Sequence, residues 1–290
     1  MAVKSFLGMV ALASILGGQA VAQTTDPDKA IAEEIKAMHW IDQGDAKLAA
    51  SKSTLSVPTH VRALTDKDAR RLSQILNGDE DAALEAIALD HHNGVVYFAF
   101  DDAGYVTLDD WAELDAAAMI EEVRTNTEKA NGERQKQGIR ALHVDGWIKQ
   151  PTLDRANNEV SWAFSAHHDD GSKLINAVAI QLGRSGFEKL IWAGNAADFE
   201  TSDFLHQMMQ ARTFDAGQRY ADHSDGDKVA GYGIAALVGA IAGAKVLKVV
   251  GGVGLLLLLK KFFWIPLLLA AGMYKRVMAF FRRGKPPTQA

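Results

Sequence analysis

The most regular alternation of apolar and polar residues runs from Val160 to Ala166, which indicates a half-buried β-strand. The dipeptide Asp170-Gly171 follows shortly after and favours a hairpin turn. Two further strands are predicted over Leu174–Leu182 and Phe187–Trp192, and a fourth precedes them over Ala141–Lys149. Consecutive strands joined by short turns usually pair, so this part of the chain predicts an antiparallel β-meander.

Helical spacing of apolar residues predicts several helices around this meander. The segment Leu114–Gln137 predicts a long, mostly polar helix whose second half is exposed to solvent. The apolar segment Leu84–Leu89 predicts one more helical turn, whereas Gly94–Phe100 is rich in β-formers and predicts a buried strand. Helices combined with an antiparallel meander define the α+β class. The other predicted helices are Thr25–Met38, Thr65–Leu76 and Thr201–Ala211, and the other short strands are Ala46–Ala50, Thr54–Val57 and His60–Leu64.

The first 22 residues contain the three parts of a secretory signal peptide. Lys4 supplies a positive charge, an apolar run follows from Phe6 to Leu16, and Ala20-Val21-Ala22 is a small-residue cleavage site. The apolar run is too short to cross a hydrocarbon core of about 30 Å comfortably. We therefore expect cleavage after Ala22 and export of the domain that follows, with an uncleaved N-terminal anchor as the alternative.

The C-terminal part contains apolar stretches that lysines interrupt. A helix over Val229–Val250 places Lys245 and Lys248 in its last turns, where both side chains could reach the membrane surface. A helix over Gly251–Met273 instead places two lysines near the bilayer centre, at a cost of about 2.5–3.5 kcal/mol each. We therefore predict one transmembrane helix over 229–250, with the basic C-terminus in the cytoplasm. A hairpin of two crossings is the alternative.

Ala235, Gly239 and Gly243 lie four residues apart within this predicted span. Small residues at that spacing let two membrane helices approach closely, which would give a homo-oligomer, but they also arise by chance in Ala- and Gly-rich segments. The sequence leaves both readings open. It predicts a protein of the bacterial inner membrane with its main domain in the periplasm. The expected order is a signal peptide (1–22), the α+β domain (23–211), a polar linker (212–228), a transmembrane helix (229–250) and an apolar, basic, membrane-associated tail (251–290).

The formal charge of -5 is unevenly distributed along the chain. Lys4 and nine basic residues after position 228 account for ten of the 31 Lys and Arg residues, and none of the 36 acidic residues lies in these two end segments. The domain between them therefore carries 21 basic against 36 acidic side chains. This negative excess repels phosphate backbones and argues against nucleic acid as a partner. The basic, apolar tail predicts a lipid bilayer as a partner instead.

Little in the sequence predicts a reaction. The chain has no cysteine, which excludes disulfides and thiol chemistry. Two groups, His91-His92 and His167–Asp170, have side chains of the types that bind metals. Neighbouring residues of a strand face opposite sides, so the two histidines of a pair cannot easily bind one ion. A solvated hairpin turn explains the group at 167–170 better. Whether the two groups meet in space stays open, and no catalytic or cofactor motif is present, so we expect no cofactor. The metal-ligand candidates are His91, His92, His167, His168, Asp169 and Asp170.

Four separated motifs carry a resemblance. They are Asp102–Val106, His143–Trp147, Gly217–Asp222 and Asp227–Ala236, in that order along the chain. In them the chain resembles a family of uncharacterised, membrane-anchored bacterial proteins, a domain of unknown function. The resemblance implies an envelope protein anchored at its C-terminus and supplies no activity. His223 stands where the family pattern leads us to expect an aromatic residue such as Phe, which affects a local packing contact.

Three functional hypotheses follow from these features. The first is a non-catalytic binding or scaffolding module of the cell envelope that presents its domain to an envelope protein or to a second copy of itself. The second is a metal-dependent or hydrolytic envelope enzyme that uses the histidine groups. The third is an accessory subunit that acts in a membrane complex through its tail.

Overall fold

The computed structural model describes residues 27–77, 81–90, 92–136, 140–194 and 196–244, so the predicted signal peptide lies outside the described residues. The chain divides into two compact units after Lys36. The first unit contains most of helix α1 (Pro27–Ala37), which confirms the helix predicted there. Proline suits the first position of a helix because its missing N–H would have no partner there.

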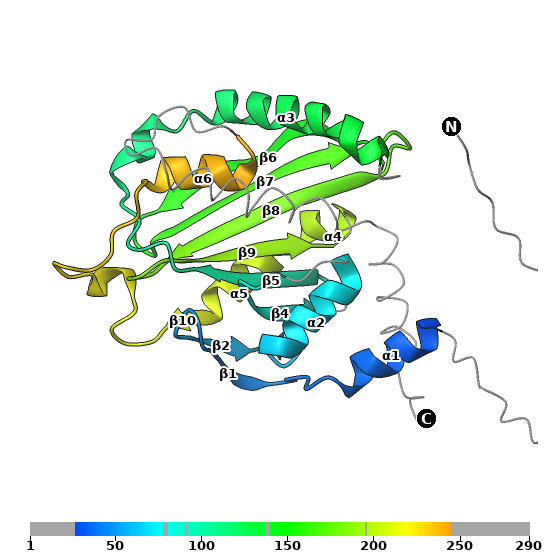
Figure 1. The fold of residues 1–290 in the computed structure, drawn as a ribbon, viewed down its shortest axis with the longest axis horizontal. Coiled ribbons are helices and arrows are strands. Elements are labelled where there is room, and N and C mark those ends of the chain that lie inside the picture. The colour runs from blue at the N-terminus through cyan, green and yellow to red at the C-terminus, as the bar shows by residue number, and fades with distance from the viewer. Residues whose placement is uncertain (1–26, 78–80, 91, 137–139, 195, 245–290) are drawn as a thin grey trace, which may run out of the picture. The chain divides into compact units, whose positions relative to one another are not determined.

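The second unit is built on a seven-stranded antiparallel sheet (Figure 1). Its strand order is β3-β4-β5-β9-β8-β7-β6, so two meanders, β3 to β5 and β6 to β9, meet where β5 pairs with β9. The predicted α+β class and antiparallel meander are confirmed. The strands are β3 (Arg62–Thr65), β4 (Leu84–Asp90), β5 (Gly94–Asp101), β6 (His143–Asp154), β7 (Glu159–His167), β8 (Lys173–Leu182) and β9 (Phe187–Ala193).

Strand β4 corrects the prediction of a helical turn over Leu84–Leu89. All seven residues of β4 are buried, because β3 and β5 flank the strand and both of its faces are covered. A strand buried on both faces has apolar residues on both, and in β4 Glu85 is buried among them, so the strand lacks the alternation that separates a strand from a short helix. The run over Gly94–Phe100 is of the same kind, and there the prediction of a buried strand is confirmed by β5.

Two tight turns set the register of the second meander. Gly171 has φ +76°, a left-handed conformation that suits glycine, and its N–H donates to the carbonyl of His168, so the predicted hairpin is confirmed. Gly186 closes the next turn where the backbone comes close to the end of β5. A Cβ atom at Gly186 would lie 1.9 Å from the carbonyl oxygen of Asp101, so only glycine fits there.

A smaller antiparallel sheet, ordered β1-β2-β10, shares a core with one face of the large sheet. The large sheet contributes many alanines to this core, among them Ala88, Ala177 and Ala179, and the small sheet contributes Leu48 and Leu55. Small side chains on one layer leave room for larger ones on the other, as close packing requires. The strands are β1 (Gly44–Leu48), β2 (Ser53–Val57) and β10 (Arg212–Phe214).

The segment after β9 departs from the prediction in two ways. One helix was expected over Thr201–Ala211, but there are two, α4 (Ala196–Thr201) and α5 (Phe204–Gln210). Residues 212–228, predicted as a polar linker, are instead part of the fold. They begin with β10, which pairs with β2, and continue into a short 3-10 helix, η2 (Tyr220–Asp222).

Helix α3 (Ala116–Lys136) confirms the long helix predicted over Leu114–Gln137 and packs against β6. Asp115 begins it, because its carboxylate accepts the N–H groups of Ala117 and Ala118 at 3.0 and 2.9 Å. The prediction that its second half is exposed is only partly right, since Thr127 and Asn131 are buried. Helix α2 (Asp66–Asn77) packs against β3 and β4 at the other edge of the sheet, and the 3-10 helix η1 (Asp109–Glu113) contacts the last described helix.

The described part of the predicted transmembrane helix is shorter than expected. Helix α6 covers only Ile234–Ala242 and ends at Gly243, whose φ of +89° is left-handed. Its first turn is held by η1, where the Asp110 carboxylate accepts the N–H groups of Ala235 and Ala236. Within the described residues, no helix combines the length and apolar character that a membrane crossing requires. Lys245, Lys248 and the tail after them lie outside the described residues.

Candidate functional site: a surface cluster of histidines and carboxylates

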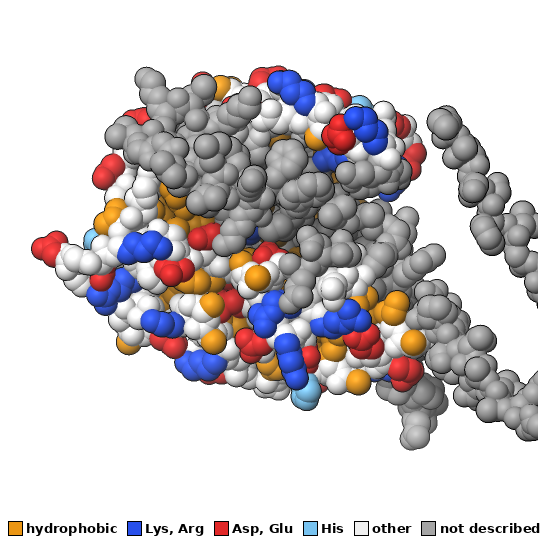
Figure 2. Space-filling view, viewed as in Figure 1, with side chains coloured by type: hydrophobic (Ala, Val, Ile, Leu, Met, Phe, Trp, Pro, Cys, Tyr) orange, Lys and Arg blue, Asp and Glu red, His pale blue; other side chains and the backbone are white. Residues whose placement is uncertain are grey.

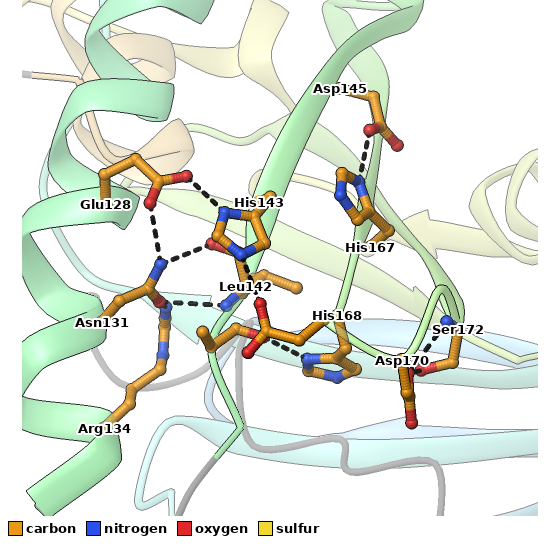
Figure 3. Close-up of polar contacts among 12 residues, drawn as sticks. Glu128, Asn131, Arg134, Leu142, His143, Asp145, His167, His168, Asp170 and Ser172 are labelled. Carbon is orange, nitrogen blue, oxygen red and sulfur yellow. Dashed lines mark hydrogen bonds and ion pairs between the residues drawn. The ribbon is translucent and has the colours of Figure 1, made fainter.

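Two histidines face each other across the β6–β7 strand pair. His143 of β6 is the register partner of His167 of β7, and their ring centroids are 5.3 Å apart (Figure 3). Residues directly opposite each other on neighbouring strands share one face of the sheet, so both imidazoles project to the same side. Three carboxylates, from Glu128, Asp145 and Asp169, contact these rings. We call these five residues the histidine cluster.

His143 is held from both sides. Its Nδ1 lies 2.8 Å from a carboxylate oxygen of Glu128 on α3, and its Nε2 lies 2.9 Å from Asp169 in the β7–β8 hairpin. These hydrogen bonds, first to Asp169 and then to Glu128, raise the pKa of His143 because the carboxylates favour the protonated ring. One imidazole thereby connects a helix, a strand and a hairpin tip.

His167 is fixed by a single carboxylate. Its Nδ1 lies 2.6 Å from Asp145 of β6, which comes two residues after His143. The strand register shifts at this point, and Arg124 of α3 donates to the backbone carbonyls of Val144 and Asp145 at 3.0 and 2.8 Å. The helix therefore holds the irregular stretch of β6 in place, and with it the Asp145 carboxylate.

A buried amide locks the backbone beside His143. Asn131 of α3 donates from Nδ2 to the carbonyl of Leu142 and accepts the N–H of Leu142 on Oδ1, at 2.9 and 3.0 Å. The same Nδ2 contacts Glu128 at 3.1 Å, and Arg134 donates to the Asn131 oxygen. This network explains why the polar second half of α3 is not simply solvated, and it fixes the distance between α3 and β6.

The predicted candidates separate into those that join the cluster and those that do not. His167 and Asp169 belong to it. His168 points the other way, is buried, and places its Nδ1 2.6 Å from the carbonyl of Ala141. Asp170 forms hydrogen bonds with Ser172 that lower its pKa to about 2, and an ion pair with Arg140 at 2.5 Å. His92 lies in the turn between β4 and β5, and His91 lies outside the described residues.

Sequence reasoning did not select His143, Glu128 or Asp145 as site residues. His143 was noted only within a family motif, and Glu128 lies on a helix that is polar throughout. The signal that would have found His143 is strand register. A regular pairing from Asp154 and Glu159 at the turn would place His143 opposite Asp170, and the register shifts along β6 bring it opposite His167 instead.

A second polar group is enclosed between the two sheets. Glu188 and Arg212 are 0% and 1% exposed, and Arg212 Nη1 lies 3.8 Å from Glu188 Oε2. Burial raises the pKa of Glu188 to about 8, with the nearby Glu85 adding to this and Arg212 opposing it. Glu85 accepts the N–H groups of Ala50 and Ser51 at 2.6 and 3.0 Å. This group is enclosed in the domain, so it concerns stability more directly than binding.

Three of the four family motifs meet at the end of the sheet opposite the histidine cluster's hairpin. The ring of Tyr105 stacks on Tyr220 and His223, with centroids 4.4 and 3.8 Å away. Arg184 joins this junction by donating to both carboxylate oxygens of Asp227, at 2.7 and 2.8 Å. The imidazole of His223 therefore takes the stacking role for which the family pattern predicts an aromatic ring.

The charges on the surface are mixed. Figure 2 shows acidic and basic side chains interspersed over the viewed face of the described residues, with apolar side chains between them. On that face, no single region of the described residues gathers the acidic side chains.

Fold and cluster define an antiparallel α+β domain with an exposed group of imidazoles and carboxylates. The chain belongs to the family described as "Protein of unknown function (DUF2167)", whose model matches residues 41–272. This confirms the resemblance to an uncharacterised family. No curated protein matches the chain. Among solved structures, it is similar to the solution structure of cyanobacterial PsbP (CyanoP) from Synechocystis sp. PCC 6803, with 9% identity and a TM-score of 0.38, over 60% of this chain and 94% of that chain.

Proposed function

We propose that this protein is a non-catalytic binding module of the bacterial cell envelope, anchored in the inner membrane by its C-terminal tail, and that the histidine cluster is its binding surface. The observation that carries the binding role is the preorganisation of the cluster. Its two imidazoles lie on paired strands, and carboxylates from α3 and β6 orient them. Sites held on rigid elements are more exact than sites on loops.

The contacts of His143 favour recognition over acid–base catalysis. A general base needs a free nitrogen that can reach the proton of a substrate. In His143 both ring nitrogens already lie within 3 Å of carboxylate oxygens. The side chains are nevertheless accessible, since His143 is 33% and His167 42% exposed. A partially exposed, fully oriented polar group suits binding to a partner.

The anchoring part of the proposal rests on the sequence of the two ends. The signal-like N-terminus exports the domain, and the basic, apolar tail holds it at the bilayer. The chain has no cysteine, so single-cysteine variants at Asp225, Val253 and Thr288 report topology without a background. With a membrane-impermeant thiol reagent on spheroplasts, we expect labelling at 225 and none at 288 until the membrane is broken. Labelling of 288 from outside would mean two crossings, and no labelling at 225 would rule out export.

The binding role can be tested by photocrosslinking in the intact envelope. A crosslinking residue replaces Lys173, which is exposed beside the cluster at the start of β8, and as a control replaces Gln210, which is exposed at the end of α5. We expect one or a few defined adducts from position 173 and none of the same size from 210. The adducts should disappear when His143 and His167 are both replaced by Ala. Identical adducts from both positions would contradict a binding surface at the cluster.

A further inference from the structure

We propose that His143 acts as a pH-operated clamp, which in its protonated form joins helix α3 to the tip of the β7–β8 hairpin and so controls binding at the histidine cluster. The clamp consists of His143, Glu128 on α3 and Asp169 in the hairpin. The inference rests on the proposed binding role of the same cluster, and it names how that role is regulated.

The two contacts of His143 require a charged ring. An ionised carboxylate has only acceptor oxygens, and a neutral imidazole has only one N–H group. His143 nevertheless places Nδ1 2.8 Å from Glu128 and Nε2 2.9 Å from Asp169, and both distances are those of hydrogen bonds. Both nitrogens therefore donate, and the ring is an imidazolium. The two carboxylates raise the pKa of His143 above its ordinary value of 6.5, Asp169 more than Glu128.

Loss of the proton breaks one of the two contacts, and the surroundings select which one. Glu128 is held a second time, because its other oxygen accepts from Nδ2 of the buried Asn131 at 3.1 Å (Figure 3). Within the described residues, Asp169 forms no hydrogen bond besides the one to His143, and its side chain is 69% exposed. Deprotonation therefore leaves the hydrogen on Nδ1 and a lone pair on Nε2, which repels the Asp169 carboxylate.

The hairpin keeps its fold when the clamp opens. His168 is buried beside it and places Nδ1 2.6 Å from the carbonyl of Ala141. Asp170 stays in its ion pair with Arg140 at 2.5 Å. Neither contact involves the Asp169 carboxylate, so opening releases that one side chain and leaves the strands as they are.

The other charged groups near His143 have partners of their own or lie farther away. Asp145 contacts His167, and Lys173 lies on the far side of His167, as its register partner in β8. Among the described residues, the two nitrogens of His143 therefore face only the two carboxylates of the clamp, which decide its protonation. The remaining charged groups lie on α3 and beside the hairpin, where they contact one another, backbone carbonyls or an amide. They are Glu121, Arg124, Arg134, Arg140 and Asp170.

The state of the clamp changes the surface that a partner meets. When it is closed, Asp169 is fixed beside the two imidazoles, and when it is open, the cluster has lost one positive charge and this fixed carboxylate. Because protonation holds the clamp closed, the closed form dominates below the pKa of His143 and is lost as the pH rises through it. A partner that docks on the closed surface is therefore bound at lower pH and released at higher pH.

NMR of the full-length protein in detergent, with its histidines labelled with ¹⁵N, tests the clamp itself. His143→Gln identifies the signals of His143 by their loss. We expect both ring nitrogens to be protonated at low pH and the hydrogen to remain on Nδ1 after titration. Glu128→Gln and Asp169→Asn should each lower the pKa of His143, whereas Asp225→Asn, at an exposed position far along the chain, should not. A neutral ring with its hydrogen on Nε2, or a pKa that neither carboxylate variant lowers, would overturn the clamp.

Photocrosslinking from position 173 in membranes buffered at a series of pH values tests the regulation. We expect the adduct yield to follow the protonated fraction of His143 and to fall to about a tenth at one pH unit above its pKa. Asp169→Asn should preserve the adducts at high pH, because an amide can donate to the lone pair of Nε2 as well as accept from its N–H. His206→Gln, at an exposed histidine of α5, is the matched control and should show the parent's pH dependence. A fall that persists in Asp169→Asn would place the titration in the partner and contradict the clamp.

The two measurements separate this inference from the proposed function. If His143 titrates as expected but the adduct yield is independent of pH, the regulation is wrong and the binding role stands. If no adducts form at any pH, the binding role and its regulation are both wrong, whatever the titration of His143 shows. Asp169→Asn changes an exposed side chain, so both tests stay valid if His143→Gln folds poorly.

Discussion

At the scale of single residues, Glu188 and Arg212 place two ionisable groups between the sheets, where water does not reach them. Glu85 shares this space, so two carboxyl groups and one guanidinium lie close together. If Glu188 keeps its proton, Arg212 and Glu85 are left as opposite charges and the group is neutral. A neutral buried group costs far less desolvation energy than one with an unbalanced charge. Arg212 also donates to Gln181 at 2.6 Å and lies over the ring of Phe214.

Stability should fall as the pH rises because of Glu188. Its pKa is about 8 in the folded protein against 4.5 ordinarily. Between these values the unfolded chain has lost a proton that the folded chain keeps, so each added pH unit favours unfolding by on the order of 1.4 kcal/mol. The effect is absent below about pH 4.5 and complete near pH 8. Unfolding in urea, followed by tryptophan fluorescence at several pH values, measures this slope.

Glu188→Gln provides the matching variant. Glutamine keeps the shape of the side chain and removes its titration, so the variant should match the parent near pH 5 and be more stable than it near pH 9. Glu133→Gln, on the exposed face of α3, should leave the pH slope as in the parent. An unchanged slope in Glu188→Gln would mean that another buried carboxyl sets it, with Glu159 as the first alternative because burial raises its pKa too.

Arg212→Met should destabilise the fold by about 3–5 kcal/mol at neutral pH, because it leaves the Glu85 carboxylate buried without a counter-charge. The double variant Glu85→Gln/Arg212→Met removes both charges and should recover much of that loss. The amide oxygen introduced by Glu85→Gln would still accept the N–H groups of Ala50 and Ser51. Equal stability of the single and double variants would show that Arg212 acts through packing and not through its charge.

At the scale of elements, two glycines differ in the space that a larger side chain would have. Gly132 lies in α3, where a Cβ would meet no atom within 4 Å, whereas a Cβ at Gly186 would lie 1.9 Å from the backbone of β5. Gly132→Ala should therefore stabilise the protein by roughly 0.5–1 kcal/mol, since alanine loses less conformational entropy in a helix. Gly186→Ala should destabilise it, because the chain must separate from β5. Thermal unfolding of both variants under one condition checks the difference in sign.

The elements also show which parts of the fold the sequence could predict. The strands from Val160 to Trp192 were predictable because alternation and the Asp170-Gly171 turn are local signals. The helical turn predicted for β4 was wrong because burial on both faces erases alternation. The prediction of a polar linker was wrong because residues 212–214 pair with β2, and the segment after them is held by contacts with residues far away in sequence, such as Arg184 with Asp227. Arg212 itself is buried beside carboxylates that the local sequence does not reveal. Polarity in sequence does not distinguish a solvated residue from a neutralised one.

The same limit applies to the histidine cluster. His167 and Asp169 were among the predicted candidates because adjacent ligand types are visible in one segment. His143, Asp145 and Glu128 come from another strand and a helix, and only register and packing bring them together. A site assembled from three elements leaves each of its residues with an ordinary local sequence. The strand pairing that unites them was predicted only as a meander, without a register.

At the scale of the whole molecule, the segment that leads towards the tail is fastened to the sheet. The backbone carbonyl of Tyr105 accepts the N–H of Ala230, and the backbone N–H of Tyr105 donates to the carbonyl of Lys228. These two hydrogen bonds form an isolated β-bridge between residues far apart in the chain. Gly104 fits here because a Cβ would lie 2.7 Å from the Lys228 carbonyl oxygen. Three family motifs therefore serve one structural purpose, which is to fix residues 217–230 against the domain. If the tail is anchored in a bilayer, this junction sets how firmly the domain is held relative to it.

The Arg184–Asp227 pair should control how tightly that segment is fastened. Asp227 accepts two hydrogen bonds from Arg184 and one from the N–H of Ser224, and these contacts hold the pKa of Asp227 well below its usual range. Asp227→Asn removes the charge that favours them, so the segment 215–230 should open more often and be cleaved faster in limited proteolysis. Asp225→Asn is the control, because Asp225 is exposed in the same loop. Mass spectrometry of the first fragments locates the cut. Cleavage within 215–230 in Asp227→Asn alone supports the role of the Arg184–Asp227 pair in fastening the segment. Equal cleavage in both variants would show that the stack of Tyr105, Tyr220 and His223 is sufficient to hold it.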